Sequence, residues 1–263
     1  MNLVFTPLKE TLVFWFRNFV PVAIITFILV VPEKILFWEF LLNRNPAGKV
    51  GWIAQGFADL LLQTVQQSAL LGLLLFSAQT ISKLEAIRRG IREGWWKFLI
   101  LNSLSAAVFA VIVDDLVDVL LHKPFLIGLI KPMMVLVGLV SAFAFAKLGP
   151  ALPTILLEQT SVEKALRRSW ILASGGYAWM GVIGYYVIYL FTSNVSRFTR
   201  ISLSEGMPSM GHIVIIGWIQ GFVASLFVVF LGCYYRTLTS LHAEWEINHG
   251  KIMRILQANS KAS

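Results

Sequence analysis

Six long apolar runs, separated by short polar segments, constrain this 263-residue chain more than any other feature of its sequence. A helix that spans a bilayer needs about 20 consecutive, mostly apolar residues to cross a hydrocarbon core about 30 Å thick. Six stretches meet this requirement, although the fifth is short: Phe19–Trp38, Phe57–Ala78, Phe98–Leu121, Phe125–Ala146, Tyr177–Thr192 and His212–Tyr235. The sequence therefore predicts an all-α, polytopic membrane protein with six transmembrane helices.

The composition excludes several other classes of protein. Hydrophobic residues make up 57% of the chain and charged residues only 14%, against about 25% charged residues in an ordinary soluble domain. A chain with so few charges would expose apolar patches too large for a soluble monomer. Cys233 is the only cysteine, so no internal disulfide forms. A soluble enzyme, a disordered tail and a disulfide-rich secreted domain are all excluded.

The placement of lysine and arginine predicts the orientation of the chain. Of the 22 basic residues, 15 lie in segments on the same side of the membrane as the N-terminus. The opposite loops carry only Arg44, Lys49, Lys123, Arg197 and Arg200. Because basic loops stay in the cytoplasm, both termini are predicted to be cytoplasmic. The net charge of +8 fits this rule and contact with anionic headgroups, so nucleic acid is not an expected partner.

An internal repeat divides the chain into three units. Residues 86–90 read AIRRG and residues 165–169 read ALRRS, and the two arginine pairs lie 79 residues apart (168 − 89). A further step of 79 residues back from Trp95 reaches Phe16, just before the first apolar run. We therefore expect one membrane domain over 1–240, with units at about 1–80, 81–158 and 159–240, and a cytoplasmic tail at 241–263. Each unit would consist of an amphipathic interfacial helix followed by a transmembrane hairpin.

Each unit also carries a helix-start signal before its first apolar run. Thr6 precedes Pro7, and proline is favoured at the first position of a helix. Two further pairs match the capping box, in which two side chains satisfy free backbone amides at a helix start. These pairs are Ser82 with Glu85 and Thr160 with Glu163.

Basic side chains gather on one face of the expected interfacial helices. In the third unit, Val162 and Leu166 share an apolar face, whereas Lys164 and Arg167 lie on the other. This pattern is typical of a helix in the headgroup plane with its basic face toward phosphates. The alternative is a helix that packs on the spans. Six residues are candidates for headgroup contact: Arg88, Arg89, Arg92, Lys164, Arg167 and Arg168.

Acidic residues within the apolar runs suggest an alternative function. Ionisable groups inside a membrane are costly, so they are candidates for a functional role by default. Asp59, Asp114, Asp115 and Asp118 all fall toward the predicted outer leaflet, and Lys131 lies at a similar depth. They would form a polar cavity for a cation or for protons in a small transporter or channel component. The alternative, which the sequence favours, is that these acids meet water and headgroups at the interface.

Motifs for catalysis are missing from the sequence. It contains no glycine-rich phosphate loop, no GxSxG, no HExxH and no CxxC, and its loops are too short for a soluble catalytic domain. His242, Glu246 and His249 have a spacing that could present three zinc ligands, but a solvated helix face explains them better. We therefore expect no enzymatic activity, no metal and no cofactor. A homo-oligomer, or assembly with other membrane proteins, stays open.

One stretch resembles a known family. Residues 151–176 read ALPTILLEQTSVEKALRRSWILASGG, in which a proline-containing exit from a span leads to an acidic helix start, ALRRSW and paired glycines. This stretch resembles the YciC-like superfamily of bacterial integral-membrane proteins, which includes the membrane domain of certain glycerophosphodiester phosphodiesterases. The resemblance implies a bacterial inner-membrane location and a part in envelope homeostasis. It carries over no active-site residue, because the phosphodiesterase relatives place their activity in a separate soluble barrel.

Overall fold

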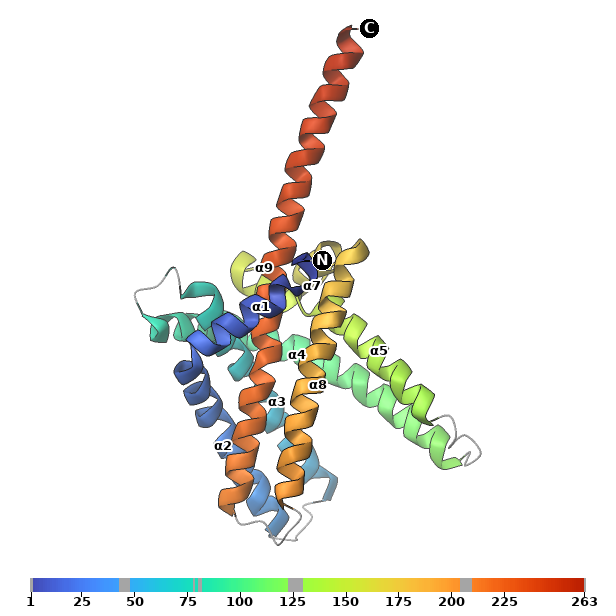
Figure 1. The fold of residues 1–263 in the computed structure, drawn as a ribbon. Coiled ribbons are helices and arrows are strands. Elements are labelled where there is room, and N and C mark those ends of the chain that lie inside the picture. Colours follow the sequence, from blue (N-terminus) through green and yellow to red (C-terminus); the bar gives the residue numbers. More distant parts are fainter. Residues whose placement is uncertain are drawn as a thin grey trace.

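The computed structural model describes residues 2–42, 48–77, 79, 82–122, 130–203 and 210–262, and these residues form helices joined by short turns (Figure 1). The longer helices are α1 (Asn2–Arg17), α2 (Phe19–Leu42), α3 (Gly48–Phe76), α4 (Lys83–His122), α5 (Ile130–Leu148), α8 (Ala178–Leu203) and α9 (Met210–Ala262). Two short helices, α6 (Ala151–Glu158) and α7 (Val162–Leu172), and a 3-10 turn, η2 (Gly175–Tyr177), link α5 to α8. The prediction of an all-helical chain is confirmed for the described residues.

Several of these helices are long and apolar enough to cross a membrane. Within the described residues, three stretches qualify alone: Gly56–Phe76, Val135–Glu158 and Met210–Ile247. Two bent helix pairs, α1 with α2 and α7 with α8, raise the number to five if each pair counts as one span. The structure thus supports a membrane protein with three to five such segments, and the predicted number of six stays a prediction.

The first and third predicted units begin with a sharp bend, and the second does not. The chain turns by 81° between α1 and α2 and by 101° between α7 and α8. Gly175, at the second bend, has a φ of +60°, which glycine adopts at little cost. In contrast, α4 runs unbroken through 40 residues, so the separate interfacial helix predicted before Phe98 is wrong. Gly90 and Gly94 do not interrupt α4; they allow neighbouring helices to pack closely against it.

The predicted helix starts are only partly correct. Ser82 Oγ accepts a hydrogen bond from the Glu85 amide at 3.2 Å, as the capping box requires. The third helix begins one residue later than predicted, since Ser161 is the N-cap of α7 and accepts from the Lys164 amide at 3.4 Å. In the first unit, α1 begins at Asn2, and Pro7 lies inside the helix instead of at its first position.

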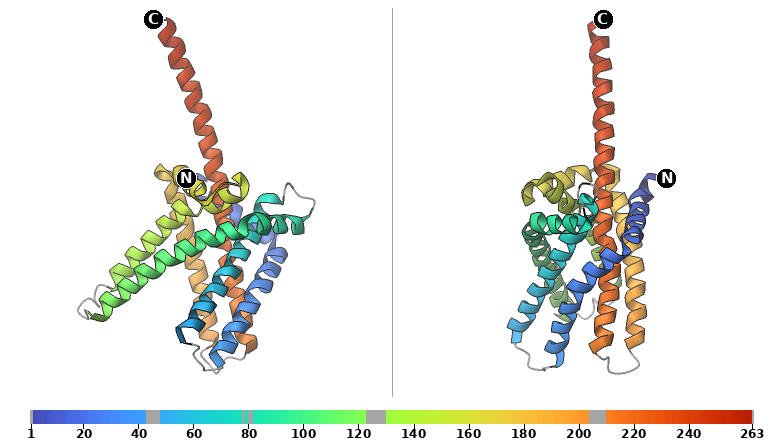
Figure 2. Two further views of the ribbon diagram at one scale, coloured as in Figure 1. Left: turned by 180° about the vertical axis from the view of Figure 1, so that it is seen from behind. Right: turned by 90° about the vertical axis from the view of Figure 1, so that its left-hand side faces the viewer.

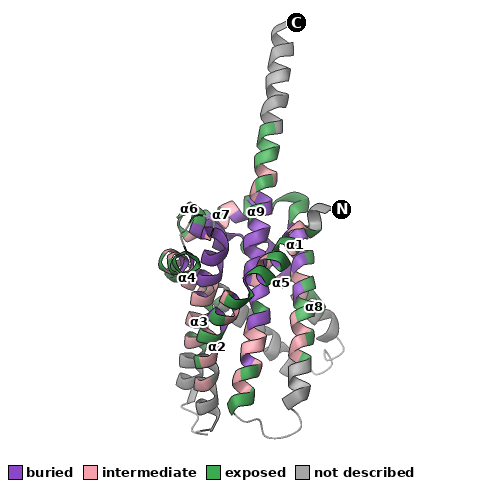
Figure 3. Ribbon diagram, turned by 60° about the vertical axis from the view of Figure 1, so that its left-hand side comes forward, coloured by how far each residue is buried: buried purple, intermediate pink, exposed green. Residues whose placement is uncertain are grey.

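The hydrophobic core lies at one end of the bundle, where the start of α1 and the end of the bundled part of α9 meet (Figure 3). We call this the terminal end. Phe230 and Tyr234 of α9 are completely buried there. They lie against Gly181 and Gly184 of α8, where a Cβ atom would overlap their rings. Small residues therefore allow α8 and α9 to approach closely, as is common between membrane helices.

Helices α3 and α4 cross with their backbones in contact. A Cβ atom added to Gly72 would lie 2.6 Å from the Gly90 Cα and 2.6 Å from the Ala86 carbonyl oxygen. A Cβ atom on Gly90 would lie 2.5 Å from the Gly72 Cα and would also overlap the Ser68 carbonyl oxygen. Each helix thus contributes two small residues four positions apart, which is the spacing that permits close helix crossings in membranes.

Beyond this crossing, the distal part of α4 and its partner α5 diverge together from the other helices (Figures 1 and 2). The described part of α5 exposes Val135, Leu136, Leu139, Val140 and Phe143. In a membrane these side chains would face lipid. At the terminal end, α9 continues well beyond the bundle as a single helix that includes most of the predicted tail at 241–263 (Figure 1).

Candidate functional site

Short helices and helix ends form a layer around α9 at the terminal end (Figure 2). Helix α1 follows α9 closely: Trp15 Nε1 donates to Ser225 Oγ at 2.9 Å, and Thr6 lines the same cavity as Ser240. Helix α1 therefore runs obliquely along α9, away from the terminal end, instead of crossing α9 at a right angle. On another side of α9, Tyr235 binds Glu158 at the end of α6.

A cavity of about 950 Å³ lies in this layer between α1, α3 and α9, and we call it the α1–α9 cavity. Helix α1 contributes Thr6, Lys9, Glu10, Val13, Phe14 and Arg17, and α3 contributes Leu74. Helix α9 contributes Cys233, Arg236, Thr237, Ser240, Leu241 and Glu244. The lining thus combines three cations and two carboxylates with apolar side chains, as would suit an amphiphilic ligand.

The cations of the α1–α9 cavity are not neutralised by direct ion pairs. Across the described part of the chain, no carboxylate lies within 4.0 Å of the charged nitrogens of Lys9, Arg17 or Arg236. All three side chains belong to exposed residues. Unpaired cations beside an apolar wall are available for an anion, and arginine in particular binds phosphate oxygens through its planar fork of donors.

Arg236 also stabilises the end of α3. Its Nη2 donates to the Leu74 carbonyl oxygen at 2.6 Å, two residues before α3 ends at Phe76. A cation at a helix C-terminus satisfies free carbonyl groups and interacts favourably with the helix dipole. One terminal nitrogen of Arg236 is thereby held, so the guanidinium is positioned on the wall of the cavity.

The predicted basic residues of the second unit differ in their surroundings. Arg89 Nε donates to Glu93 Oε1 at 2.9 Å, and the Arg89 guanidinium lies 4.2 Å from the centre of the Phe76 ring. Arg92 is 3.7 Å from the same carboxylate, but its side chain is 68% exposed. Arg88 is exposed as well. Arg89 therefore ties α4 to the end of α3, whereas Arg88 and Arg92 are available at the surface.

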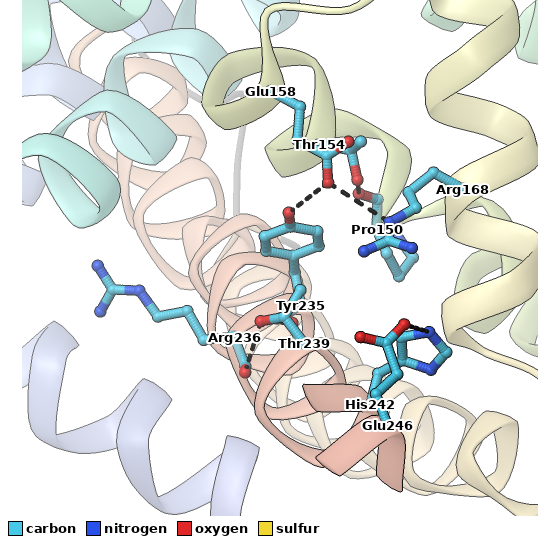
Figure 4. Close-up of polar contacts among 9 residues, drawn as sticks. All are labelled: Pro150, Thr154, Glu158, Arg168, Tyr235, Arg236, Thr239, His242 and Glu246. Atoms are coloured by element: carbon cyan, nitrogen blue, oxygen red, sulfur yellow. Dashed lines mark hydrogen bonds and ion pairs between the residues drawn. The ribbon is translucent and has the colours of Figure 1, made fainter. Parts of the chain in front are cut away.

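In the third unit too, one arginine joins neighbouring helices while the other basic residues lie at the surface (Figure 4). Arg168 Nε lies 3.5 Å from Glu158 Oε1, and Tyr235 donates to that oxygen at 3.1 Å, so this cluster joins α6, α7 and α9. Arg167 pairs with Glu163 at 2.9 Å on an open surface, where such a pair contributes little to stability. Lys164 is exposed. Lys164 and Arg167 are thus the residues of α7 that can reach a headgroup.

Replacing Tyr235 with phenylalanine tests the structural part of this cluster. The change removes one hydrogen bond to a half-exposed carboxylate, so we expect the free energy of unfolding to fall by about 1 kcal/mol. Thermal unfolding of the purified protein in detergent measures the effect. Tyr189→Phe, at an exposed position of α8, is the matched control and should leave the midpoint unchanged. An equal shift in both variants would contradict the role given to the Tyr235 hydroxyl.

One lysine counted with the basic loops is buried. Lys147, at the end of α5, is only 8% exposed, and its Nζ lies 4.9 Å from the centre of the Trp170 ring. Its carbonyl oxygen accepts a hydrogen bond from Ser169 Oγ at 2.5 Å. Lys147 therefore packs α5 against α7 through a cation–π contact and is not presented to headgroups.

Of the predicted acidic cavity, only the Asp59 side chain belongs to the described residues. Asp59 is half-buried on α3 and has an interaction partner. Asp114, Asp115 and Asp118 fall in α4, and Lys131 falls in α5, but their side chains lie outside the described residues. The cluster thus stays a prediction.

The histidines of α9 show one contact. His242 Nε2 lies 3.2 Å from Glu246 Oε1, one turn along α9 (Figure 4), and the side chain of His249 lies outside the described residues. Within the part of the chain that the structure describes, no three histidine, cysteine or acidic side chains gather in a way that could hold a metal ion.

The cations of the α1–α9 cavity were not predicted as a site. Lys9, Arg17 and Arg236 contributed only to the predicted orientation of the chain. The spacing of Lys9, Val13 and Arg17, four residues apart, indicates one face of a helix, but nothing in the sequence indicates that this face meets Arg236.

Comparison of the chain with protein-family models, with curated proteins and with solved structures finds no match in any of the three. The geometry of the terminal end is therefore the basis for proposing a function.

Proposed function

We propose that this protein is a non-catalytic integral membrane protein that binds anionic lipid headgroups in the α1–α9 cavity. The observation that carries the proposal is the set of three cations, Lys9, Arg17 and Arg236, which line a cavity of about 950 Å³ and form no direct ion pair with a described residue. Basic residues at a membrane interface attract anionic lipids by about 1 kcal/mol each. Val13, Phe14 and Leu74 would contact the upper part of the acyl chains.

Exposed cations elsewhere in the terminal layer would extend the same contact. Arg88 and Arg92 at the start of α4, and Lys164 and Arg167 on α7, are exposed residues. We propose that they bind headgroups less specifically, from the open surface. Arg89 and Arg168 would act indirectly, because their contacts with Glu93 and Glu158 hold these helices in place.

We also propose a topology of six spans with both termini in the cytoplasm. Helix α4 would supply the sixth span, in addition to the five segments counted above. The three units would then each start on the cytoplasmic side, in agreement with the predominance of lysine and arginine there. In line with the resemblance to the YciC-like superfamily, we place the protein in a bacterial inner membrane, with a scaffolding part in envelope homeostasis.

Native mass spectrometry of the full-length protein tests the lipid contact. We expect gently purified wild type to retain phosphatidylglycerol in preference to phosphatidylethanolamine. Lys9→Gln with Arg17→Gln should reduce the retained anionic lipid about tenfold, if each lost contact contributes about 0.7–1 kcal/mol. Arg88→Gln with Arg167→Gln should have a smaller effect, since these cations lie outside the cavity.

Arg197→Gln with Arg200→Gln is the charge-matched control, because these arginines lie toward the far end of α8. This control should keep its bound lipid. Equal retention of phosphatidylglycerol by wild type and by the Lys9/Arg17 variant would overturn the proposal. Flux assays on variants of the acidic residues would then test the transporter alternative.

A further inference from the structure

A second cavity, of about 370 Å³, lies between α2, α3 and α9. Its polar lining consists of Gln63, Gln66 and Gln67 of α3 with Gln220 and Ser225 of α9. Small and apolar residues, among them Val30, Gly221 and Ala224, complete it. We call it the glutamine cavity. None of the described residues that line it is charged.

In the proposed topology, the glutamine cavity lies deep in the membrane. Gln66 lies ten residues before Phe76, where α3 and its apolar segment end. At about 1.5 Å per residue, ten residues correspond to about 15 Å, or half of a hydrocarbon core about 30 Å thick. A site at this depth is reached by a lipid-soluble molecule from within the bilayer.

Two of the four amides have no partner in the described part of the chain. Gln67 Oε1 accepts from Asn102 Nδ2 at 2.8 Å, and Gln220 also has an interaction partner. Gln63 and Gln66 make no side-chain hydrogen bond with any described residue. An unpaired amide in hydrocarbon is strongly disfavoured, so these groups call for a hydrogen-bonding partner beyond the described residues, which a bound molecule would supply.

The cavity opens to the side of the bundle. Gln63 and Ala224, on its two walls, are both exposed. Its volume is in the usual range for a small-molecule site. This volume favours a compact polar group of a small molecule as the occupant over the flat face of a second helix. The mixture of amides from α3 and α9 with glycine, alanine and valine fits an amphiphile whose polar group is small.

We propose that the glutamine cavity binds the uncharged, hydroxyl-bearing head of a membrane lipid of the diacylglycerol class. A hydroxyl both donates and accepts, and ester carbonyls accept, so this head matches the donors and acceptors of Gln63 and Gln66. A charged headgroup would be disfavoured, since the described residues of the lining offer no counter-charge. This site is separate from the α1–α9 cavity and has the opposite charge preference, so its test is independent of the test for anionic lipid in that cavity; it rests on the membrane topology of the proposed function.

Photo-crosslinking tests the proposal. The full-length protein is reconstituted in phosphatidylcholine nanodiscs with a diacylglycerol that carries a diazirine on one acyl chain. We expect crosslinks in peptides that contain residues 60–70 and 217–228, and competition by unlabelled diacylglycerol but not by phosphatidylglycerol. Ala224→Phe places a ring in the cavity and should abolish these crosslinks. Ile215→Phe, at an exposed position of α9 outside the cavity, is the matched control and should keep them.

A second variant keeps the test informative if Ala224→Phe fails to fold. Gln63→Leu with Gln66→Leu keeps a similar side-chain size but removes both free amides, so diacylglycerol labelling should fall about tenfold. Equal labelling of this variant and wild type would overturn the proposal, and so would equal competition by phosphatidylglycerol.

Two other occupants of the cavity are tested with introduced cysteines. In a Cys233→Ser background, Ala224→Cys should not react with a membrane-impermeant thiol reagent. Fast reaction there would mean that water fills the cavity. Gln63→Cys in the same background should not form a disulfide between two copies of the chain. Such a disulfide would mean that a second copy covers the amides, and either result would overturn the lipid assignment.

Discussion

Replacing Gly90 with alanine is expected to lower the thermal unfolding midpoint by about 10 °C, although the change adds a single methyl group. The new Cβ atom would lie 2.5 Å from the Gly72 Cα and would overlap the Ser68 carbonyl oxygen. Both obstacles are backbone atoms, which cannot rotate away as a side chain can. Helices α3 and α4 must separate to admit the methyl group, at a cost of about 3 kcal/mol.

Gly56→Ala is the matched control on α3. An added Cβ atom at Gly56 meets nothing within 4 Å, so only helix propensity should act. Alanine is favoured over glycine in a helix by about 1 kcal/mol, and Gly56→Ala should therefore stabilise the protein. Opposite signs of the two shifts, measured by thermal unfolding in one detergent, would support the backbone crossing. Shifts of the same sign and size would contradict it.

Combining Gly90→Ala with Gly72→Ala should cost less than the sum of the two single changes. Each methyl group separates the same pair of helices, and the second is accommodated in space that the first has already opened.

Replacing Tyr234 with alanine is expected to lower the free energy of unfolding by about 3–5 kcal/mol. The Tyr234 side chain is fully buried between α8 and α9, and its hydroxyl donates to the Tyr177 carbonyl oxygen at 3.0 Å. The variant loses the contact of the ring with Gly181 and leaves a cavity, because the small residues of α8 cannot fill the space. It also leaves the Tyr177 carbonyl without this donor.

Thermal unfolding again measures the effect, with Tyr189→Ala at an exposed position of α8 as the control. Tyr234→Phe separates the two contributions, since it keeps the ring and removes only the hydrogen bond, at about 1 kcal/mol. A Tyr234→Ala midpoint equal to that of Tyr189→Ala would mean that α8 and α9 do not pack as described.

Much of the fold could be predicted from hydropathy alone. Each apolar run of about 20 residues coincides with a helix over the part that the structure describes, because hydropathy and helix length both follow from crossing the hydrocarbon core. The bends were less predictable. Residues Gly175 and Gly176 accompany a sharp turn, whereas Gly90 and Gly94 lie within the unbroken α4. A glycine allows either a turn or a close contact, and only the tertiary structure decides between them.

The candidate site could be predicted only in part. The basic faces of α4 and α7 follow from helical periodicity, which is a local property of the sequence. The α1–α9 cavity joins Lys9, Leu74 and Arg236, which are far apart in the chain. Their meeting depends on how α1 descends along α9, and no local pattern encodes that packing. The glutamine cavity has the same origin, since its amides come from α3 and α9.

A cysteine introduced at Ser240 in a Cys233→Ser background offers the most direct test of the proposed headgroup site, because Ser240 lines the α1–α9 cavity and is exposed, whereas Cys233 is only 2% exposed. The measurement is the rate of alkylation of this cysteine by a small maleimide in nanodiscs of phosphatidylcholine, with and without phosphatidylglycerol. A bound headgroup should slow the reaction by about tenfold when the lipid exceeds its Kd tenfold. Adding Lys9→Gln and Arg17→Gln to this background should give one rate in both membranes. Equal rates for the Ser240→Cys protein with and without phosphatidylglycerol would contradict the assignment of this cavity to anionic lipid.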